Sequence, residues 1–450
     1  MIKIYINKSF AEEKKYIIET LLGEFLGIDF EIFFFEKKAY LLKIENGNEI
    51  EIIDSFFSKI PSNNSFLERK NIPDKIVFGK NKFCVEDDIP IIFGNEKIEV
   101  NKNKILCGID IFSSSFFMLT RWEEYINKAR DKHDRFPGKE SVAYKFSFLQ
   151  RPVVNEYIEM LWNMLVQLGN EQKRKKRTFT PYITHDIDYI LKWISVRSFL
   201  RSLIGDVYLR RNFKLLFKNV LKYFKVRKRI LKDEFDTFDY LMDLVEKYDL
   251  KSYFFFMVGG TSGFDNGYSL SHPYFEEIIQ KIKNRGHYIG IHPSFNTYKN
   301  YEQLKKEIEI LKNLIKSPIS FGRQHYLRFE VPITWQIWND LGMKWDSSMY
   351  YDDQYGFRTG TCYEYSVFNF LTRKKLNLKE NTLVYMDSTL VDKGMSENEM
   401  KGKIFDLIEK VKKYNGNFTF LWHNSNLTSH FWKKFIPVYE NVVKNLNIEL

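Results

Sequence analysis

Short apolar runs alternate with amphipathic stretches through the second half of the chain. Seven runs have the length and the β-branched or aromatic content of buried strands. They are residues 180–184, 253–258, 288–291, 319–322, 344–345, 382–385 and 417–422. Helical patterns lie between most of them, for example at 274–283, 301–315 and 397–413. We therefore predict an α/β fold whose parallel strands close into a distorted seven-stranded (β/α) barrel, with an open doubly wound sheet as the alternative.

The first half of the chain mixes strand and helix patterns. Strand patterns occur at 32–35 and 91–93, and a helical pattern covers 154–168. A run of charged residues at 171–177 follows that helix and has the composition of an exposed linker. We predict a mixed α/β N-terminal domain of unknown role at 1–170 and the barrel at 178–450.

Ionisable side chains gather at the ends of the predicted strands. They are Asp186, Asp188, His292, Arg323, Asp346, Asp387 and His423. In a parallel barrel the carboxyl ends of the strands form the active-site face. Several strands that each supply an ionisable group at that face predict an active site there.

The first of these strands ends in two carboxylates, Asp186 and Asp188. They share one side of an extended chain, so one can bind a divalent metal while the other accepts a proton from water. Pro293 suits the first turn of a helix, which would place His292 and Asn296 on one helical face at a chelating spacing. We expect His287, which faces the opposite way, to be structural.

Further candidates follow the later strands. Arg323 beside Asp186 would keep that carboxylate ionised and oriented, or else make a structural salt bridge. His325 offers a substitute metal ligand or a substrate contact, and we also place Tyr326 and Asp346 on the substrate side. His423, at the end of a strongly apolar strand, is the candidate general acid.

Composition narrows the class of protein. Hydrophobic residues make up 44% of the chain and aromatic residues 17%, which indicates a folded globular protein. The N-terminal residues lack the apolar core of a signal peptide, and no run approaches the roughly 18 apolar residues of a membrane span. We expect a cytoplasmic protein. Three cysteines give no disulfide framework, and we expect reduced buried thiols.

One segment is strongly basic. Residues 197–232 contain twelve Lys/Arg and one acid, a net charge of +11 that equals the excess of the whole chain. Phe213, Phe217, Leu221 and Phe224 fall at helical spacing within it. A helical insertion at 195–233 is predicted, either packed on the barrel with a solvated face or able to contact an anionic membrane or glycan. Nucleic acid fits poorly, because no nucleic-acid-binding motif accompanies the charge.

The motifs resemble those of a known family. Four segments are similar to the motifs of the polysaccharide deacetylases, which are carbohydrate esterases with a NodB homology domain. They are Thr184-His185-Asp186-Ile187-Asp188, residues 286–293, Gly322-Arg323 and residues 420–423. The resemblance covers about residues 178–450. Residues 345–350 and 356–361 resemble the corresponding segments of a bacterial subgroup linked to surface-polysaccharide gene clusters. The first half of the chain resembles the uncharacterised domain that precedes the deacetylase domain in that subgroup.

The resemblance implies a metal-dependent hydrolase, commonly a zinc enzyme, that removes acetyl groups from glycans by cleaving carbon–nitrogen or ester bonds. It assigns Asp186 as catalytic base, Asp188 and His292 as metal ligands, Arg323 as the residue that steadies the base, and His423 as general acid. The family's second histidine ligand aligns with Asn296.

Two other functions stay open. Asn296 in place of a histidine favours a catalytically silent protein that binds glycan or scaffolds surface-polysaccharide assembly. A hydrolase acting on a small non-sugar amide would use the same residues.

Overall fold

The computed structural model describes residues 1–61, 64–208, 211, 213–260, 262–265, 268–391, 393–428 and 431–447, with only the backbone described at 206 and 215. Contacts divide the chain into two compact units. The first comprises Met1–Thr180, Tyr326–Tyr385 and Asp406–Thr419. The second comprises Pro181–His325, Met386–Phe405 and Phe420–Leu450.

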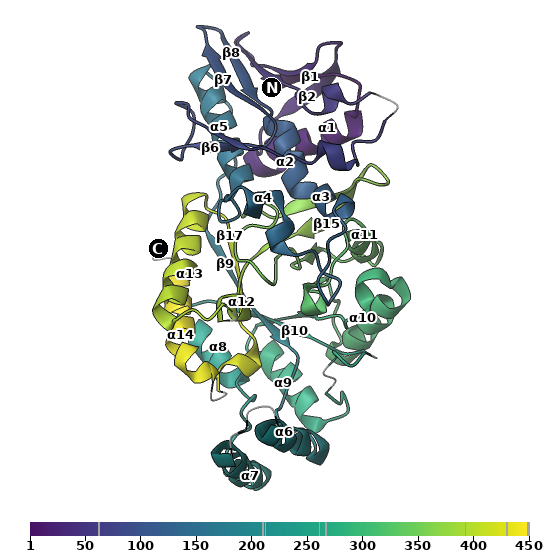
Figure 1. The fold of residues 1–450 in the computed structure, drawn as a ribbon, viewed down its shortest axis with the longest axis vertical. Coiled ribbons are helices and arrows are strands. Elements are labelled where there is room, and N and C mark those ends of the chain that lie inside the picture. Colours follow the sequence, from purple (N-terminus) through teal and green to yellow (C-terminus); the bar gives the residue numbers. More distant parts are fainter. Residues whose placement is uncertain are drawn as a thin grey trace. The chain divides into compact units, whose positions relative to one another are not determined.

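A six-stranded mixed sheet with the order β2-β1-β3-β4-β8-β7 organises the N-terminal part of the first unit (Figure 1). Its strands are β1 (Ile2–Ile6), β2 (Phe30–Phe34), β3 (Ala39–Lys43), β4 (Glu49–Ile53), β7 (Gly94–Val100) and β8 (Lys104–Ile109). β5 (Val77–Gly79) and β6 (Ile89–Ile91) form a separate pair. Alternate residues of β1, namely Ile2, Ile4 and Ile6, are buried, as expected for a strand with one face in a core.

Helices complete the first unit. They are α1 (Ala11–Ile18), α2 (Ile111–Thr120), α3 (Trp122–Ile126), α4 (Val142–Lys145), α5 (Val153–Gln167) and α11 (Ile333–Asp340). All of α2 is buried, and its N-cap residue Asp110 accepts a hydrogen bond from the Ser113 N–H. The first unit also contains a buried ion network. The guanidinium groups of Arg121 and Arg358 both bind the Glu124 carboxylate. Burial alone would raise the pKa of Glu124, but the two guanidinium groups lower it to about 2.

The second sheet has nine strands in the part of the chain that the structure describes, in the order β14-β15-β13-β12-β11-β10-β9-β17-β16. Seven correspond to the predicted strands: β9 (Thr180–Ile187), β10 (Ser252–Phe256), β11 (Tyr288–Ile291), β12 (Phe321–Gly322), β13 (Trp345–Asp346), β16 (Leu383–Met386) and β17 (Asn417–Leu421). The other two, β14 (Tyr365–Asn369) and β15 (Lys374–Glu380), pair as an antiparallel hairpin. The α/β class is confirmed, and the predicted count of seven is corrected to nine.

Backbone pairing aligns the ends of four parallel strands in the second unit. Ile187 of β9 pairs with Phe256 of β10, which pairs with Ile291 of β11, and Ile291 in turn pairs with Gly322 of β12. A Cβ atom on Gly322 would lie 2.0 Å from the Ile291 carbonyl oxygen, so only glycine permits this approach. The residues that follow these four positions therefore leave the sheet at one level.

The helices associated with the second sheet are mostly amphipathic. They are α6 (Val196–Tyr208), α7 (Phe213–Arg227), α8 (Phe238–Glu246), α9 (Pro273–Asn284), α10 (Tyr301–Ile315), α12 (Asp387–Val391), α13 (Glu397–Lys413) and α14 (Ile436–Leu446). Helices α6 and α7 lie within the basic segment and contact each other as a hairpin. Among the described residues, no helix combines the length and apolar character needed to span a membrane. All three cysteines are free, but only Cys107 and Cys362 are buried; Cys84 is half-buried.

Candidate metal centre

Two strand ends and one loop of the second unit bring three ligand-type side chains together. Asp188 follows β9, His292 follows β11, and His325 lies three residues beyond the end of β12. One ligand atom from each lies within 4.8 Å of the others. The register that levels the ends of β9, β11 and β12 gathers these residues, although Asp188 and His325 are 137 positions apart in the sequence.

The spacing of these atoms suits one metal ion. Asp188 Oδ1 lies 3.4 Å from His292 Nε2 and 3.6 Å from His325 Nε2. Ligands about 2.0–2.1 Å from a tetrahedral zinc lie about 3.3 Å apart, so little movement would bring these atoms to one ion. Asp188 Oδ1 is also buried and makes no hydrogen bond within the described chain. A buried carboxylate oxygen of this kind is costly unless a cation occupies the space beside it.

The orientation of His292 leaves the correct nitrogen free for a metal. Its Nδ1 atom lies 2.7 Å from the Arg323 carbonyl oxygen, so Nδ1 carries the proton and donates it to that carbonyl. In the neutral ring that a metal requires, Nε2 then carries the lone pair and faces Asp188. A backbone acceptor on the far nitrogen is the usual support for a metal-binding histidine.

His325 has a carboxylate as its support. Its Nδ1 atom lies 3.4 Å from Asp265 Oδ1, which also accepts a 2.7 Å hydrogen bond from the Phe295 N–H. Burial would raise the pKa of Asp265, but the hydrogen bonds from His325, Phe295 and Ser262 lower it to about 2. Asp265 is therefore ionised at neutral pH and can orient His325. The sequence contains no local signal for this role, because Asp265 lies in a loop 60 residues before His325.

The acidic and basic groups of the cluster stabilise each other's charges. Burial alone would raise the pKa of Asp188, but the neighbouring imidazoles of His292 and His325 hold it well below its usual range. Burial alone would lower the pKa of His292, but Asp186 and Asp188 raise it. The site thus has an electrostatic field that favours a cation next to Asp188.

The predicted contact between Arg323 and Asp186 is present. Arg323 Nη1 donates to Asp186 Oδ1 at 2.9 Å and to Thr184 Oγ1 at 2.9 Å. The Thr184 hydroxyl donates in turn to the Phe420 carbonyl at 3.0 Å. All three side chains are buried. Asp186 is held on one side by this chain of hydrogen bonds, and its Oδ2 atom lies 3.8 Å from His292 Nδ1.

His423 is paired with a carboxylate that follows the neighbouring strand β16. Its Nδ1 atom lies 2.9 Å from Asp387 Oδ1, and its backbone N–H donates to Asp387 Oδ2 at 2.9 Å. Asn426 donates to the same oxygen. Burial would lower the pKa of His423, but the charge of Asp387 raises it to about 10. The sequence identified Asp387 only as a strand-end residue; its pairing with His423 was missed.

Two other histidines are structural. His287 Nδ1 accepts a hydrogen bond from the Ser252 N–H at 3.0 Å, and Nε2 lies 2.9 Å from Glu246 Oε1, in agreement with the sequence interpretation. His185 lies between the Trp422 carbonyl, 2.7 Å from Nδ1, and the Ser252 hydroxyl. Burial lowers the pKa of His185 to about 4, so this side chain is neutral.

The helical argument for Asn296 is wrong. No helix begins at Pro293; a turn follows, and the next regular element is the 3₁₀ helix Thr297–Lys299. His292 and Asn296 therefore do not share a helical face. Asn296 is exposed, whereas His292 and His325 are buried. His325, which the sequence analysis named as a substitute ligand, is the third member of the cluster that the structure brings together.

Two predicted substrate contacts, Tyr326 and Asp346, belong to the first unit. The Tyr326 carbonyl accepts a hydrogen bond from Arg135, and its ring lies 4.7 Å from the His133 ring. Asp346 is buried and accepts hydrogen bonds from the Ser348 N–H and hydroxyl. Their contact with a substrate stays a prediction.

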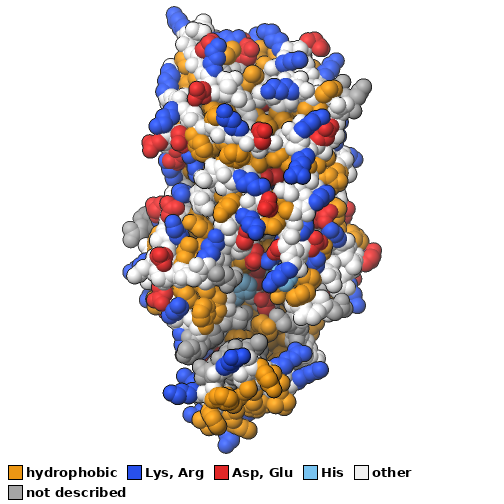
Figure 2. Space-filling model, in the orientation of Figure 1, with side chains coloured by type: hydrophobic (Ala, Val, Ile, Leu, Met, Phe, Trp, Pro, Cys, Tyr) orange, Lys and Arg blue, Asp and Glu red, His pale blue; other side chains and the backbone are white. Residues whose placement is uncertain are grey.

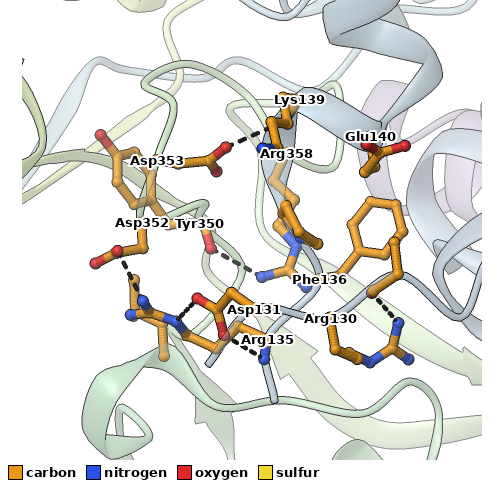
Figure 3. A pocket seen from close by; sticks show the side chains of 13 residues that line it. Arg130, Asp131, Arg135, Phe136, Lys139, Glu140, Tyr350, Asp352, Asp353 and Arg358 are labelled. Carbon is orange, nitrogen blue, oxygen red and sulfur yellow. Dashed lines mark hydrogen bonds and ion pairs between the residues drawn. The ribbon is translucent and has the colours of Figure 1, made fainter. Parts of the chain in front are cut away.

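A cavity of about 390 Å³ lies in the first unit (Figure 3). None of the predicted site residues lines it. Arg135 binds both Asp131 and Asp352, and the Lys139 N–H donates to Asp353 (Figure 3). These ion pairs and hydrogen bonds account for much of its charged lining.

Residues 2–170 match the model of a family of unknown function, DUF7033. No curated protein matches the chain.

Among solved structures, similarity is weak. A Mycobacterium smegmatis protein assigned as a polysaccharide deacetylase has 10% identity and a TM-score of 0.39, over 61% of this chain and 86% of that one. Puue allantoinase has 12% identity and a TM-score of 0.29, over 46% and 64%. The catalytic domain of a peptidoglycan N-acetylglucosamine deacetylase from Eubacterium rectale has 16% identity and a TM-score of 0.25, over 45% and 77%.

Proposed function

We propose that the protein is a metal-dependent hydrolase that removes an acetyl or other acyl group from a sugar or polysaccharide precursor. The observation that carries this proposal is the buried Asp188 Oδ1 atom, which makes no hydrogen bond in the described chain and faces two imidazole nitrogens at 3.4 and 3.6 Å. The acylated sugar as substrate class comes from the resemblance of the sequence motifs.

Asp188, His292 and His325 would hold the ion. One carboxylate and two imidazoles form a donor set typical of catalytic zinc sites, which keep a further position open. When bound, such an ion polarises an acyl carbonyl and lowers the pKa of water. Zinc is the metal we expect.

Asp186 would act as the general base. Arg323, whose guanidinium also donates to the Thr184 hydroxyl, fixes its carboxylate from one side, so Asp186 can accept the proton that the attacking water loses. Arg323 is a positioning residue in this scheme, because its contact is with the base.

His423 would act as the general acid. Asp387 keeps its imidazole protonated and oriented, with Nδ1 facing the carboxylate and Nε2 available to donate a proton. Transfer of that proton to the departing amine or alcohol completes the cleavage of the acyl bond. After cleavage Asp186 carries the proton taken from water, and His423 has lost one to the leaving group. Proton exchange with solvent restores both groups.

The direct test is acetate release from a panel of N- and O-acetylated sugars, alongside cyclic and formyl amides. We expect release from acetylated sugars that depends on added divalent metal and falls roughly a hundredfold or more in Asp186→Asn. Glycan binding without bound metal or hydrolysis would support the silent scaffold instead. Turnover of the cyclic or formyl amides alone would show that the substrate is a small amide and not an acetylated sugar.

A further inference from the structure

The hairpin of α6 and α7 exposes two apolar stripes. On α6 the stripe consists of Val196, Leu200, Ile204 and Tyr208, each four residues after the last. On α7 it consists of Phe213, Phe217, Leu221 and Phe224. Their exposed fractions run from 51% at Leu200 to 76% at Tyr208. Figure 2 shows an apolar patch at the lower end of the view, where Figure 1 places these helices.

These stripes are additional to the residues that hold the hairpin together. Phe199 of α6 stacks on Tyr223 of α7 with ring centroids 3.7 Å apart, and Trp193 packs edge-on against both rings. Leu203 and Val220 pack against this small core. The hairpin therefore has its own interior, and the stripes lie outside it.

Basic residues border both stripes. Arg197 and Arg201 each follow a stripe residue of α6, and Lys214, Lys218 and Lys225 each follow a stripe residue of α7. Consecutive helical residues are about 100° apart, so these cations form a row along one margin of each stripe. All five are exposed, and Figure 2 shows blue side chains beside the apolar patch.

The hairpin is joined to the rest of the second unit by two acids. Asp233 accepts hydrogen bonds from the backbone N–H groups of Lys192 and Trp193 at 2.7 and 3.1 Å. Glu234 binds the ammonium groups of both Lys192 and Lys222. These contacts fix the segment that precedes α6 and the middle of α7 relative to the segment that leads into α8.

We propose that this hairpin docks the protein on an anionic lipid surface. A bilayer with acidic headgroups matches both properties of the hairpin: the acyl region accepts the large apolar side chains, and the headgroups neutralise the bordering Lys and Arg. A soluble polyanion, such as a nucleic acid or an acidic glycan, would satisfy the charge and leave the apolar stripes in water. A second copy of the hairpin would bring together two segments that each carry a net charge of +11.

The test is cosedimentation of the full chain with vesicles of phosphatidylcholine alone or with 30 mol% phosphatidylglycerol. We expect binding to the anionic vesicles and little to the neutral ones. Lys214→Glu/Lys218→Glu/Lys225→Glu should lower the partition coefficient on the order of a hundredfold. Phe213→Ser/Phe217→Ser should lower it by a similar factor. The matched control Lys305→Glu/Lys306→Glu/Lys312→Glu, on exposed positions of α10, makes the same change in charge and should bind at nearly the native level.

A second measurement reports insertion directly. In Phe217→Trp, anionic vesicles should shift the added tryptophan emission to the blue, and brominated lipid acyl chains should quench it. Failure of the wild type to bind anionic vesicles would overturn the proposal, as would binding that the serine variant retains. A dimer in solution that the serine variant abolishes would instead assign the stripes to a second copy. Because none of these readouts involves catalysis, they are independent of the proposed hydrolase activity.

Discussion

His292 Nε2 and Asp188 Oδ1 lie 3.4 Å apart at the ends of two parallel strands, β11 and β9, that are separated in the sheet by β10. The pair is formed by backbone register, because Ile291 and Ile187 both pair with Phe256. The Arg323 carbonyl fixes the imidazole from behind. Backbone pairing in the sheet therefore positions two of the three candidate ligands, Asp188 and His292. The third, His325, is positioned by the loop that follows β12.

Substitution of His325 and of Asn296 should show which of the two residues is the third metal ligand. We expect His325→Ala to weaken zinc binding by more than the roughly 10–100-fold that loss of an outer partner costs, because it removes a donor atom. Asn296→Ala should leave affinity nearly unchanged, since Asn296 is exposed. Competition titration with a chromogenic zinc chelator measures both. A larger loss in Asn296→Ala would return the ligand role to the asparagine.

The support behind His325 should have a measurable effect of its own. Asp265→Ala removes the acceptor 3.4 Å from His325 Nδ1, so we expect zinc affinity to fall roughly 10–100-fold. Asp265→Asn retains an oxygen acceptor and should recover part of the loss. The same titration, with circular dichroism to check that each variant is folded, distinguishes positioning from unfolding. Equal affinity in wild type and Asp265→Ala would rule out the role.

The pairing of His423 with Asp387 predicts a pH effect. His423 can donate a proton only below its pKa, which Asp387 raises to about 10, so activity should be lost as pH rises through that range. Without the anion in Asp387→Asn, the alkaline limb of kcat/KM should move down toward the usual histidine value near 6.5. A pH profile of acetate release measures the shift. An alkaline limb unchanged by the substitution would show that a different group is titrating.

Arg323 should affect the base without affecting the metal. In Arg323→Ala the Asp186 carboxylate loses its 2.9 Å hydrogen bond and becomes free to rotate, so we expect kcat to fall about a hundredfold with zinc content unchanged. The effect should be small in an Asp186→Asn background, because both changes disable the same proton transfer. Kinetics of the two single variants and the double variant test this; additive losses would mean that Arg323 acts elsewhere.

His287 provides a structural contrast within the same strand region. His287→Ala leaves the buried Ser252 N–H without its imidazole acceptor, which should lower the free energy of unfolding by about 1–3 kcal/mol. Zinc affinity should stay at the wild-type level. Thermal denaturation and zinc titration on the same preparation check both halves, and a loss of metal with unchanged stability would contradict the structural assignment.

The sequence predicted those parts of the site that lie directly at strand ends. Asp186, His292, Arg323 and His423 each follow an apolar run whose length and composition mark a strand, and each was located for that reason. The β14–β15 hairpin was missed because β15 contains charged residues at most outward positions, as in Lys374 and Lys375, which mask its strand character. Seven predicted strands therefore became nine.

Local sequence patterns do not predict the positions of the site residues that lie in loops. Pro293 suggested a helix, but a turn and a short 3₁₀ helix follow it, and Asn296 is exposed as a result. His325 and Asp265 meet through the path of two loops, and Asp265 carries no motif. Only tertiary structure could identify that pair.

The most direct measurement of the central claim is anomalous scattering from crystals grown with zinc, recorded on both sides of the zinc absorption edge. We predict one strong peak about 2.0–2.3 Å from a carboxylate oxygen of Asp188 and from Nε2 of both His292 and His325. A zinc peak bound elsewhere, or coordinated by Asn296 in the absence of His325, would contradict it.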